Sequence, residues 1–121
     1  MRVQAECIVE QDERGVAVIT LSGEHDMVSV DEVRETILSA ASDGPVVVNL
    51  SQADFIDSSI INSLIRTHEK CDGRLVLEVA TSQSVRRILE ITGLMTVIPT
   101  AEKRDQAVGL ALTARDGPAD D

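Results

Sequence analysis

The sequence predicts an α/β fold in one domain, with a mixed sheet of about five strands and about four helices packed mainly on one face of it. Two strand-like runs joined by a tight turn begin the chain, and strand-like and helix-like segments alternate after them. The hairpin supplies an antiparallel pair. Right-handed crossovers between the later, parallel strands bring their helices to the same side. A length of 121 residues suits one domain rather than two.

The predicted hairpin consists of two β-prone runs, Ala5 to Gln11 and Val16 to Ser22, with Asp12 to Gly15 as the turn between them. The second run alternates apolar and polar residues well enough for a strand that is buried on one face. The polar tetrad Gly23-Glu24-His25-Asp26 follows this run, and we expect it to form a loop that leads to the first helix.

The first helix is predicted from Ser29 to Ser42, because apolar residues recur there at helical spacing. Ser29 and Glu32 have the Ser-x-x-Glu spacing of a capping box, and Gly44-Pro45 ends the helix. The residues of the apolar stripe are Val30, Val33, Ile37, Leu38 and Ala41.

The run VVVNL, Val46 to Leu50, is typical of a buried strand because it is short and rich in β-branched residues. The polar loop SQAD and the apolar pair Phe55-Ile56 connect it to Asp57-Ser58-Ser59, where a second helix begins and continues to about Lys70. We expect its apolar side to carry Ile60, Ile61, Leu64 and Ile65, and its other side to carry Asn62, Ser63, Arg66 and Thr67.

The rest of the chain continues the alternation of strands and helices. The predicted elements are a strand from Arg74 to Ala80, a helix capped by Ser82 and ended by Gly93, a short strand from Met95 to Pro99, and a terminal helix from Ala101 to Thr113. The acidic residues 115–121 are predicted to form a mobile tail.

The composition excludes several classes of function. A net charge of −10, from 21 acidic and 11 basic residues, repels nucleic acids and anionic membrane surfaces. Phe55 is the single aromatic residue, so the chain offers no platform for stacking bases. No apolar run approaches the roughly 18 residues that span a membrane. We therefore expect a cytoplasmic protein that binds neither nucleic acid nor membrane.

The residues that usually carry metal or redox chemistry are few and widely separated. Cys7 and Cys71 form no Cys-x-x-Cys motif, which favours a reducing compartment without disulfides. His25 and His68 lack the spacing of metal ligands. Because no paired-carboxylate, metal or phosphate-loop pattern appears, we expect neither a cofactor nor enzymatic activity.

Asp57-Ser58-Ser59 is the most informative motif, because it stands where a loop meets the start of a helix. Backbone N–H groups at a helix start are unpaired and carry partial positive charge. An Asp or Ser at this point most often caps the helix, and a Ser can also carry a phosphate that the helix end tolerates. No neighbouring His or Lys activates these hydroxyls, so a serine nucleophile is poorly supported.

The stretch VVVNLSQADFIDSSIINSLI resembles the signature of the STAS domain, in particular that of the bacterial anti-sigma factor antagonists. The family reads Asp-Ser-Ser/Thr-Gly-Leu at this helix start, and Ile60 stands here in place of the usual Gly. The resemblance implies a single STAS-like domain over residues 1–114 and makes Ser58 the phosphorylated residue, with Ser59 as second choice. Gly23, Glu24 and Asp26 match the family's G-E-x-D loop, which contributes to partner binding.

The resemblance further implies a regulator of bacterial transcription, for example in stress responses. The unmodified protein would bind an anti-sigma factor serine kinase and free a sigma factor, phosphorylation would end this binding, and a metal-dependent serine phosphatase would restore it. Site residues expected to bind the partner are Glu24, Asp26, Asp57, Ser59, Ile60, Asn62, Ser63 and Arg66. Of these, we expect Ile60, Asn62, Ser63 and Arg66 to form an exposed rim.

Two other functions stay open from the sequence. The first is a STAS scaffold that is never phosphorylated, either in a multi-protein assembly or as an accessory subunit of a lipid transporter; Ile60 favours it. The second is a receiver phosphorylated on Asp57. It fits poorly, because a receiver needs a helix between its first two strands and only a tight turn is present here.

Overall fold

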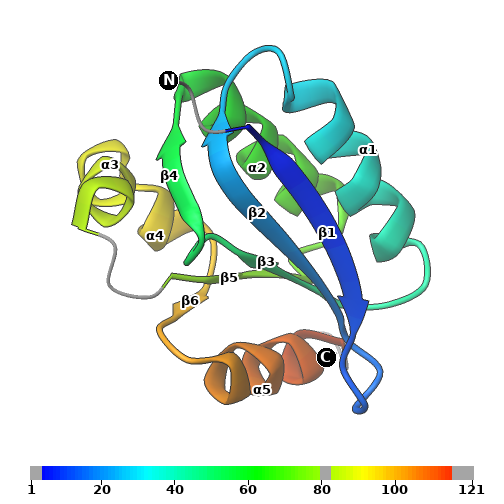
Figure 1. The fold of residues 1–121 in the computed structure, drawn as a ribbon. Coiled ribbons are helices and arrows are strands. Elements are labelled where there is room, and N and C mark those ends of the chain that lie inside the picture. The colour runs from blue at the N-terminus through cyan, green and yellow to red at the C-terminus, as the bar shows by residue number, and fades with distance from the viewer. Residues whose placement is uncertain (1–3, 80–82, 116–121) are drawn as a thin grey trace.

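The computed structural model describes residues 4–79 and 83–115, and within them six strands form one sheet in the order β1-β2-β3-β5-β6, with β4 paired to β2 (Figure 1). Strands β1 and β2 are antiparallel, and the other pairs are parallel. The predicted single α/β domain with a mixed sheet is confirmed. The strands are β1 (Glu6–Gln11), β2 (Ala17–His25), β3 (Val46–Asn49), β4 (Ala53–Ile56), β5 (Leu75–Glu78) and β6 (Thr100–Ala101).

The helices of the described residues cover the two faces of the sheet unequally. They are α1 (Val30–Ala41), α2 (Ser58–Lys70), α3 (Gln83–Thr92), α4 (Leu94–Val97) and α5 (Arg104–Arg115). Helices α1 to α4 share one apolar core with the sheet, and α5 packs alone on the opposite face. The helices therefore lie mainly on one face, as predicted.

The central strands serve both cores because successive side chains point to opposite faces of a sheet. In β3, Val46 and Val48 belong to the larger core and Val47 to the smaller one. In β5, Leu75 and Leu77 face the larger core and Val76 the smaller one. Burial on both faces explains why these strands read as continuous apolar runs rather than as alternating ones.

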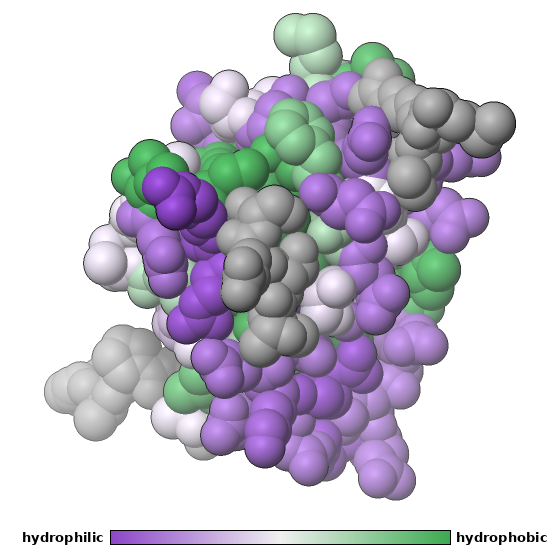
Figure 2. Space-filling model, turned by 60° about the vertical axis from the view of Figure 1, so that its left-hand side comes forward, coloured by the Kyte–Doolittle hydropathy of each residue, from purple (hydrophilic) through white to green (hydrophobic). Residues whose placement is uncertain are grey.

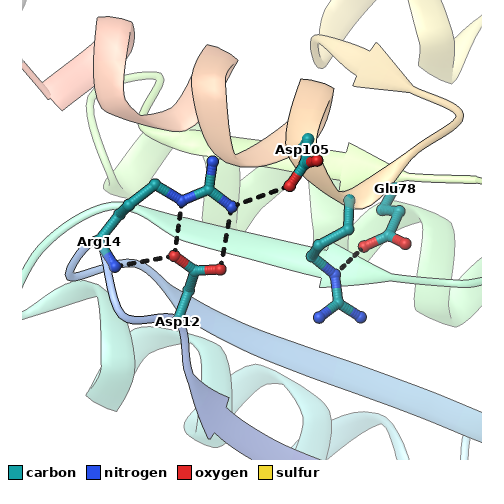
Figure 3. Close-up of polar contacts among 5 residues, drawn as sticks. Asp12, Arg14, Glu78 and Asp105 are labelled. Atoms are coloured by element: carbon teal, nitrogen blue, oxygen red, sulfur yellow. Dashed lines mark hydrogen bonds and ion pairs between the residues drawn. The ribbon is translucent and has the colours of Figure 1, made fainter.

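The two ends of the molecule differ in surface character. Apolar side chains gather toward the end at which α2 begins, at the top of both views, whereas the opposite end is mainly hydrophilic (Figure 2). At that opposite end, ion pairs join α5 to the rest of the fold (Figure 3). Arg104 Nε lies 2.6 Å from the nearly buried Glu78 carboxylate, and Arg14 bonds both Asp12 and Asp105.

Two segments that the sequence presented as polar loops are strands. Strand β2 continues through Gly23, Glu24 and His25, and residues 53–56 form β4 beside it. Gly23 N–H donates to Gln52 O at 3.2 Å, and the register shifts between Gly23 and Glu24. The loop prediction was wrong because Ala53 and Ile56 supply enough apolar burial for a strand between polar neighbours.

The predicted strand from Met95 to Pro99 is also wrong. This segment contains the single turn of α4, and the last strand, β6, follows it. Gly93 adopts a left-handed backbone with φ 74°, and Ile98 N–H donates to Leu94 O at 2.9 Å. Leu94 and Ile98 are both fully buried at i, i+4 spacing, which a helical turn satisfies and a strand does not. Ser82, the predicted cap of α3, and residues 116–121 of the predicted tail lie outside the described residues.

Candidate functional site

Asp57 caps the start of α2. Its backbone is extended, with φ −110° and ψ −176°, and its Oδ1 accepts hydrogen bonds from Ser59 N–H at 3.0 Å and Ile60 N–H at 3.2 Å. A carboxylate in this position pairs two backbone donors that the helix leaves unpaired and faces the positive end of the helix dipole. Capping, which the sequence assigned to Asp or Ser in general, therefore belongs to Asp57.

The two serines after the cap differ in what their hydroxyls can do. Ser59 is half-buried, and its Oγ donates to Asp57 Oδ1 at 2.5 Å. Ser58 is exposed, and its hydroxyl makes no hydrogen bond to any described residue. Ser58 thus presents an accessible oxygen at the first position of the helix, and a reagent approaching it displaces no existing contact.

The rim predicted on α2 is only half correct. Asn62 and Arg66 are exposed, but Ile60 is fully buried in the larger core and Ser63 is 7% exposed. The prediction failed because α1 packs against the side of α2 that carries Ser63 and Thr67. Small polar residues allow close helix contact there, so the buried arc of α2 is wider than its apolar stripe. The bulk of Ile60 points into the core instead of toward a partner.

The predicted loop residues lie at the same edge of the sheet as the start of α2. Strands β2 and β4 are parallel, with Glu24 opposite Phe55 and His25 opposite Ile56. Asp26 therefore follows the end of β2 as Asp57 follows the end of β4. Glu24 and Asp26 are half-buried, and Asp26 Oδ1 accepts a hydrogen bond from Val28 N–H at 2.9 Å. The fold thus brings the two sequence motifs to one end of the molecule (Figure 1).

His25 holds the loop between β2 and α1, a role that the sequence did not reveal. Its side chain is buried, with Nε2 at 3.0 Å from both Glu6 O and Ser22 O, and Nδ1 at 2.9 Å from Ser29 Oγ. The Ser29 hydroxyl is directed to His25 and to the backbone of Asp26, and it makes no capping bond to α1. The predicted capping box of Ser29 and Glu32 is therefore wrong.

Apolar side chains surround the acidic loop. Met27 and Val28 are 73% and 83% exposed, and Phe55 is 44% exposed on the neighbouring strand. The β2–α1 loop and the end of β4 lie toward the end of the molecule at which apolar side chains gather (Figures 1 and 2). Met27 and Val28 could be noticed in the sequence only as two successive apolar residues in a segment that neither a helix nor a strand buries. Exposed apolar groups beside charged ones are typical of protein-binding surfaces.

Other kinds of site find no support in residues 4–79 and 83–115. No group of three or more His, Cys, Asp or Glu residues lies close enough there to hold a metal ion. None of the described helices combines the length and apolar character that a membrane-spanning helix requires. Burial raises the pKa of the Cys7 and Cys71 thiols above the ordinary value, which makes both poor nucleophiles at neutral pH.

Comparisons with known proteins agree with this arrangement. The model of the STAS domain family matches residues 8–107. The anti-sigma-F factor antagonist RsfB of Mycobacterium tuberculosis is 33% identical over 86 residues, covering 69% of this chain and 70% of RsfB. A crystal structure of an anti-sigma factor antagonist from Mycobacterium paratuberculosis superposes with a TM-score of 0.80 and 27% identity, covering 90% of this chain and 95% of that chain. The anti-sigma factor antagonist SpoIIAA in its unphosphorylated form gives a TM-score of 0.67 and 25% identity, covering 89% of this chain and 97% of that chain.

Proposed function

Because the chain belongs to the STAS domain family, we propose that it is an anti-sigma factor antagonist switched by phosphorylation of Ser58. In its unmodified form it binds an anti-sigma factor serine kinase, and the kinase then releases its sigma factor. The kinase transfers the γ-phosphoryl group of ATP to Ser58 Oγ, which loses its proton as ADP leaves. A metal-dependent serine phosphatase hydrolyses the phosphoserine and restores binding.

The observation that carries the proposal is the exposed, unbonded hydroxyl of Ser58 at the first position of α2. A phosphate there adds about −1.5 to −2 charges and meets the positive end of the helix dipole. Asp57 keeps its capping bonds to Ser59 and Ile60, since none of them involves the Ser58 side chain. Phosphorylation can therefore change the surface while the fold stays as it is. SpoIIAA, a relative with the same fold, has a form named as unphosphorylated.

The surface around Ser58 supports a protein partner that carries basic and apolar groups. Asp26 and Asp57 flank it with negative charge, Met27 and Val28 offer apolar area, and Glu24 lies on the adjoining strand. On α2, the exposed Asn62 and Arg66 extend the same surface. A phosphate pressed into an interface that fits a neutral hydroxyl costs desolvation and repulsion. A loss of about 3 kcal/mol weakens binding roughly a hundredfold.

The test is a binding and phosphorylation assay with the cognate serine kinase. Wild type and Ser58→Ala should both bind the kinase, and Ser58→Glu should bind at least tenfold more weakly. With ATP, the wild type should gain the mass of one phosphoryl group, and Ser58→Ala should gain none. Ser59→Ala is the matched control and should still be modified. Phosphate mapped to Ser59, or equal binding by all variants, would overturn the proposal.

The same assay distinguishes the phosphorylated antagonist from a second candidate function. That candidate is a STAS scaffold that is never phosphorylated and acts in a multi-protein assembly or as an accessory subunit of a lipid transporter. It predicts an unchanged mass with every serine kinase tried. In the sequence, Ile60 in place of the family's Gly favours this scaffold. Ile60 is fully buried, so its side chain leaves the Ser58 hydroxyl uncovered, and this favours the phosphorylated antagonist.

A further inference from the structure

The groove between α1 and α2 differs in charge from the rest of this acidic molecule. It consists of two adjoining hollows of about 290 and 250 Å³ that share Arg34 and Arg66, and Lys70 lines the second. No Asp or Glu of the described residues lines either hollow. The hollow beside the β2–α1 loop is lined by Glu24 and Asp26 instead. In a chain with a net charge of −10, the α1–α2 groove is where an anion meets local positive charge.

The basic groups of the groove are available to a ligand. Arg66 and Lys70 are exposed and form no ion pair with any described residue. Arg34 pairs with Asp31 at 2.9 Å, but the two side chains are 41% and 76% exposed, so solvent weakens this ion pair and a ligand can replace it. By contrast, Arg14 and Arg104 are held in ion pairs with residues far away in the sequence.

A buried hydroxyl in the same groove lacks a partner. Ser63 lines the first hollow and is 7% exposed, and its Oγ has no hydrogen-bond partner among the described residues. Thr67, one turn further along, already donates its hydroxyl to Ser63 O. Buried hydroxyls are almost always paired, so an unpaired one beside two arginines indicates a missing acceptor.

We propose that the α1–α2 groove binds a small phosphate-bearing molecule through Arg34, Arg66 and the Ser63 hydroxyl. A guanidinium group donates two parallel hydrogen bonds to a pair of oxygens on one anion. A phosphate has enough oxygens to accept such bonds from two arginines, whereas a carboxylate has only one pair. Lys70 adds a point charge further along the groove, where the rest of the ligand lies. The combined volume suits a small molecule. The groove shares Arg66 with the proposed partner surface but does not include the Ser58 hydroxyl, and phosphate binding in it needs neither the kinase nor its phosphoryl transfer.

The test titrates the full-length, isotopically labelled protein without any kinase, so its result is independent of the proposed function. Inorganic phosphate, glucose 6-phosphate and succinate are added at constant ionic strength, and amide NMR shifts are followed. Phosphate should give saturable shifts confined to α1 and α2, with a dissociation constant of about 10 mM or below. Tighter binding of glucose 6-phosphate identifies a phosphate ester as the ligand; equal binding identifies free phosphate. Saturable binding of succinate with equal affinity would overturn the phosphate assignment.

Variants distinguish phosphate binding in the groove from non-specific ionic effects on the basic residues of the surface. Arg66→Gln should weaken phosphate binding at least tenfold, whereas Arg87→Gln, an exposed arginine on α3 outside the groove, should leave it unchanged. Ser63→Ala removes an unpaired buried hydroxyl, so thermal stability should stay equal or rise while phosphate binding weakens severalfold. The proposal is wrong if no saturable shift appears, if shifts spread over all basic residues, or if Arg66→Gln binds like wild type.

Discussion

His25 Nδ1 lies 2.9 Å from Ser29 Oγ, and this contact joins the end of β2 to the residue before α1. On the other side of the ring, Nε2 lies 3.0 Å from the backbone oxygens of Glu6 and Ser22. Carbonyl oxygens only accept hydrogen bonds, so Nε2 carries a proton. One buried imidazole thus connects β1, β2 and α1, and it fixes both ends of the loop that exposes Met27 and Val28.

Replacing His25 with Phe keeps a ring of similar size and removes these hydrogen bonds. We expect a loss of about 1 to 3 kcal/mol in the free energy of unfolding, measured by urea denaturation, because buried polar groups lose their partner. We also expect faster hydrogen exchange at the Val28 and Ser29 amides, which the loop now protects. Ser29→Ala is the control that removes the Nδ1 contact and the weaker bonds of the Ser29 hydroxyl to the Asp26 backbone, but keeps the Nε2 bonds to Glu6 and Ser22. It should have a smaller effect on the free energy of unfolding. Unchanged exchange in His25→Phe would show that the loop is held by other contacts.

The division of roles between Asp57 and Ser58 predicts opposite effects on stability. Asp57→Ala removes the acceptor for Ser59 N–H and Ile60 N–H, and we expect it to lower the free energy of unfolding by about 1 kcal/mol. Ser58→Ala should change it by less than about 0.5 kcal/mol, since that hydroxyl makes no contact with a described residue. Both are measured by urea denaturation. A larger loss in Ser58→Ala than in Asp57→Ala would assign the cap to Ser58.

Strong periodic signals made much of the fold predictable. The apolar runs of β3 and β5, and residues such as Val33 and Ile37 in α1, were assigned correctly because each buries a face set by its spacing. The sequence predicts that α2 begins at Asp57-Ser58-Ser59, because these polar residues stand between the apolar pair Phe55-Ile56 and the apolar stripe of the helix. The structure has Ser58 as the first residue of α2. Local pattern and tertiary burial agree in these segments.

The errors arise where tertiary contacts override the local pattern. Strand β4 reads as a loop, since its pairing with β2 depends on a partner 30 residues away in the chain, with Gly23 opposite Ala53. Ser63 and Thr67 read as a solvent face, and only the approach of α1 buries them. His25 is polar and isolated in sequence, so neither its burial nor its bonds to Glu6 and Ser22 could be inferred from its neighbours.

Ile60 departs from the family's glycine, and its burial predicts the effect of restoring that glycine. Ile60→Gly should lower the free energy of unfolding by about 3 to 6 kcal/mol, because it leaves a cavity in the core and adds the cost of glycine in a helix. Ile60→Val should cost about 0.5 to 1.5 kcal/mol. Asn62→Gly, at an exposed position of the same helix, isolates the backbone effect and should cost less than about 1 kcal/mol. Equal losses in the two glycine variants would contradict the packing role of Ile60.

The hairpin turn between β1 and β2 makes the stability of the folded protein depend on pH in the acidic range. The Arg14 side chain and backbone N–H bond the Asp12 carboxylate and hold its pKa below the ordinary value (Figure 3). The unfolded chain therefore binds a proton at Asp12 more readily than the folded chain does. The contribution of Asp12 is fully present above its ordinary pKa and is lost as the pH falls through the folded-state pKa.

Arg14→Gln should therefore melt at a lower temperature than wild type near pH 7, and the difference should shrink as the pH falls from about 5 toward 2. Thermal unfolding followed by circular dichroism at several pH values measures this. Asp12→Asn keeps an acceptor for the Arg14 backbone N–H but cannot titrate, so its melting temperature should converge with that of wild type over the same range. Arg87→Gln, on an exposed position of α3, should give a difference that does not vary with pH. A difference between Arg14→Gln and wild type that stays constant down to about pH 2 would mean that Arg14 acts through packing or through Asp105 instead of through the Asp12 carboxylate.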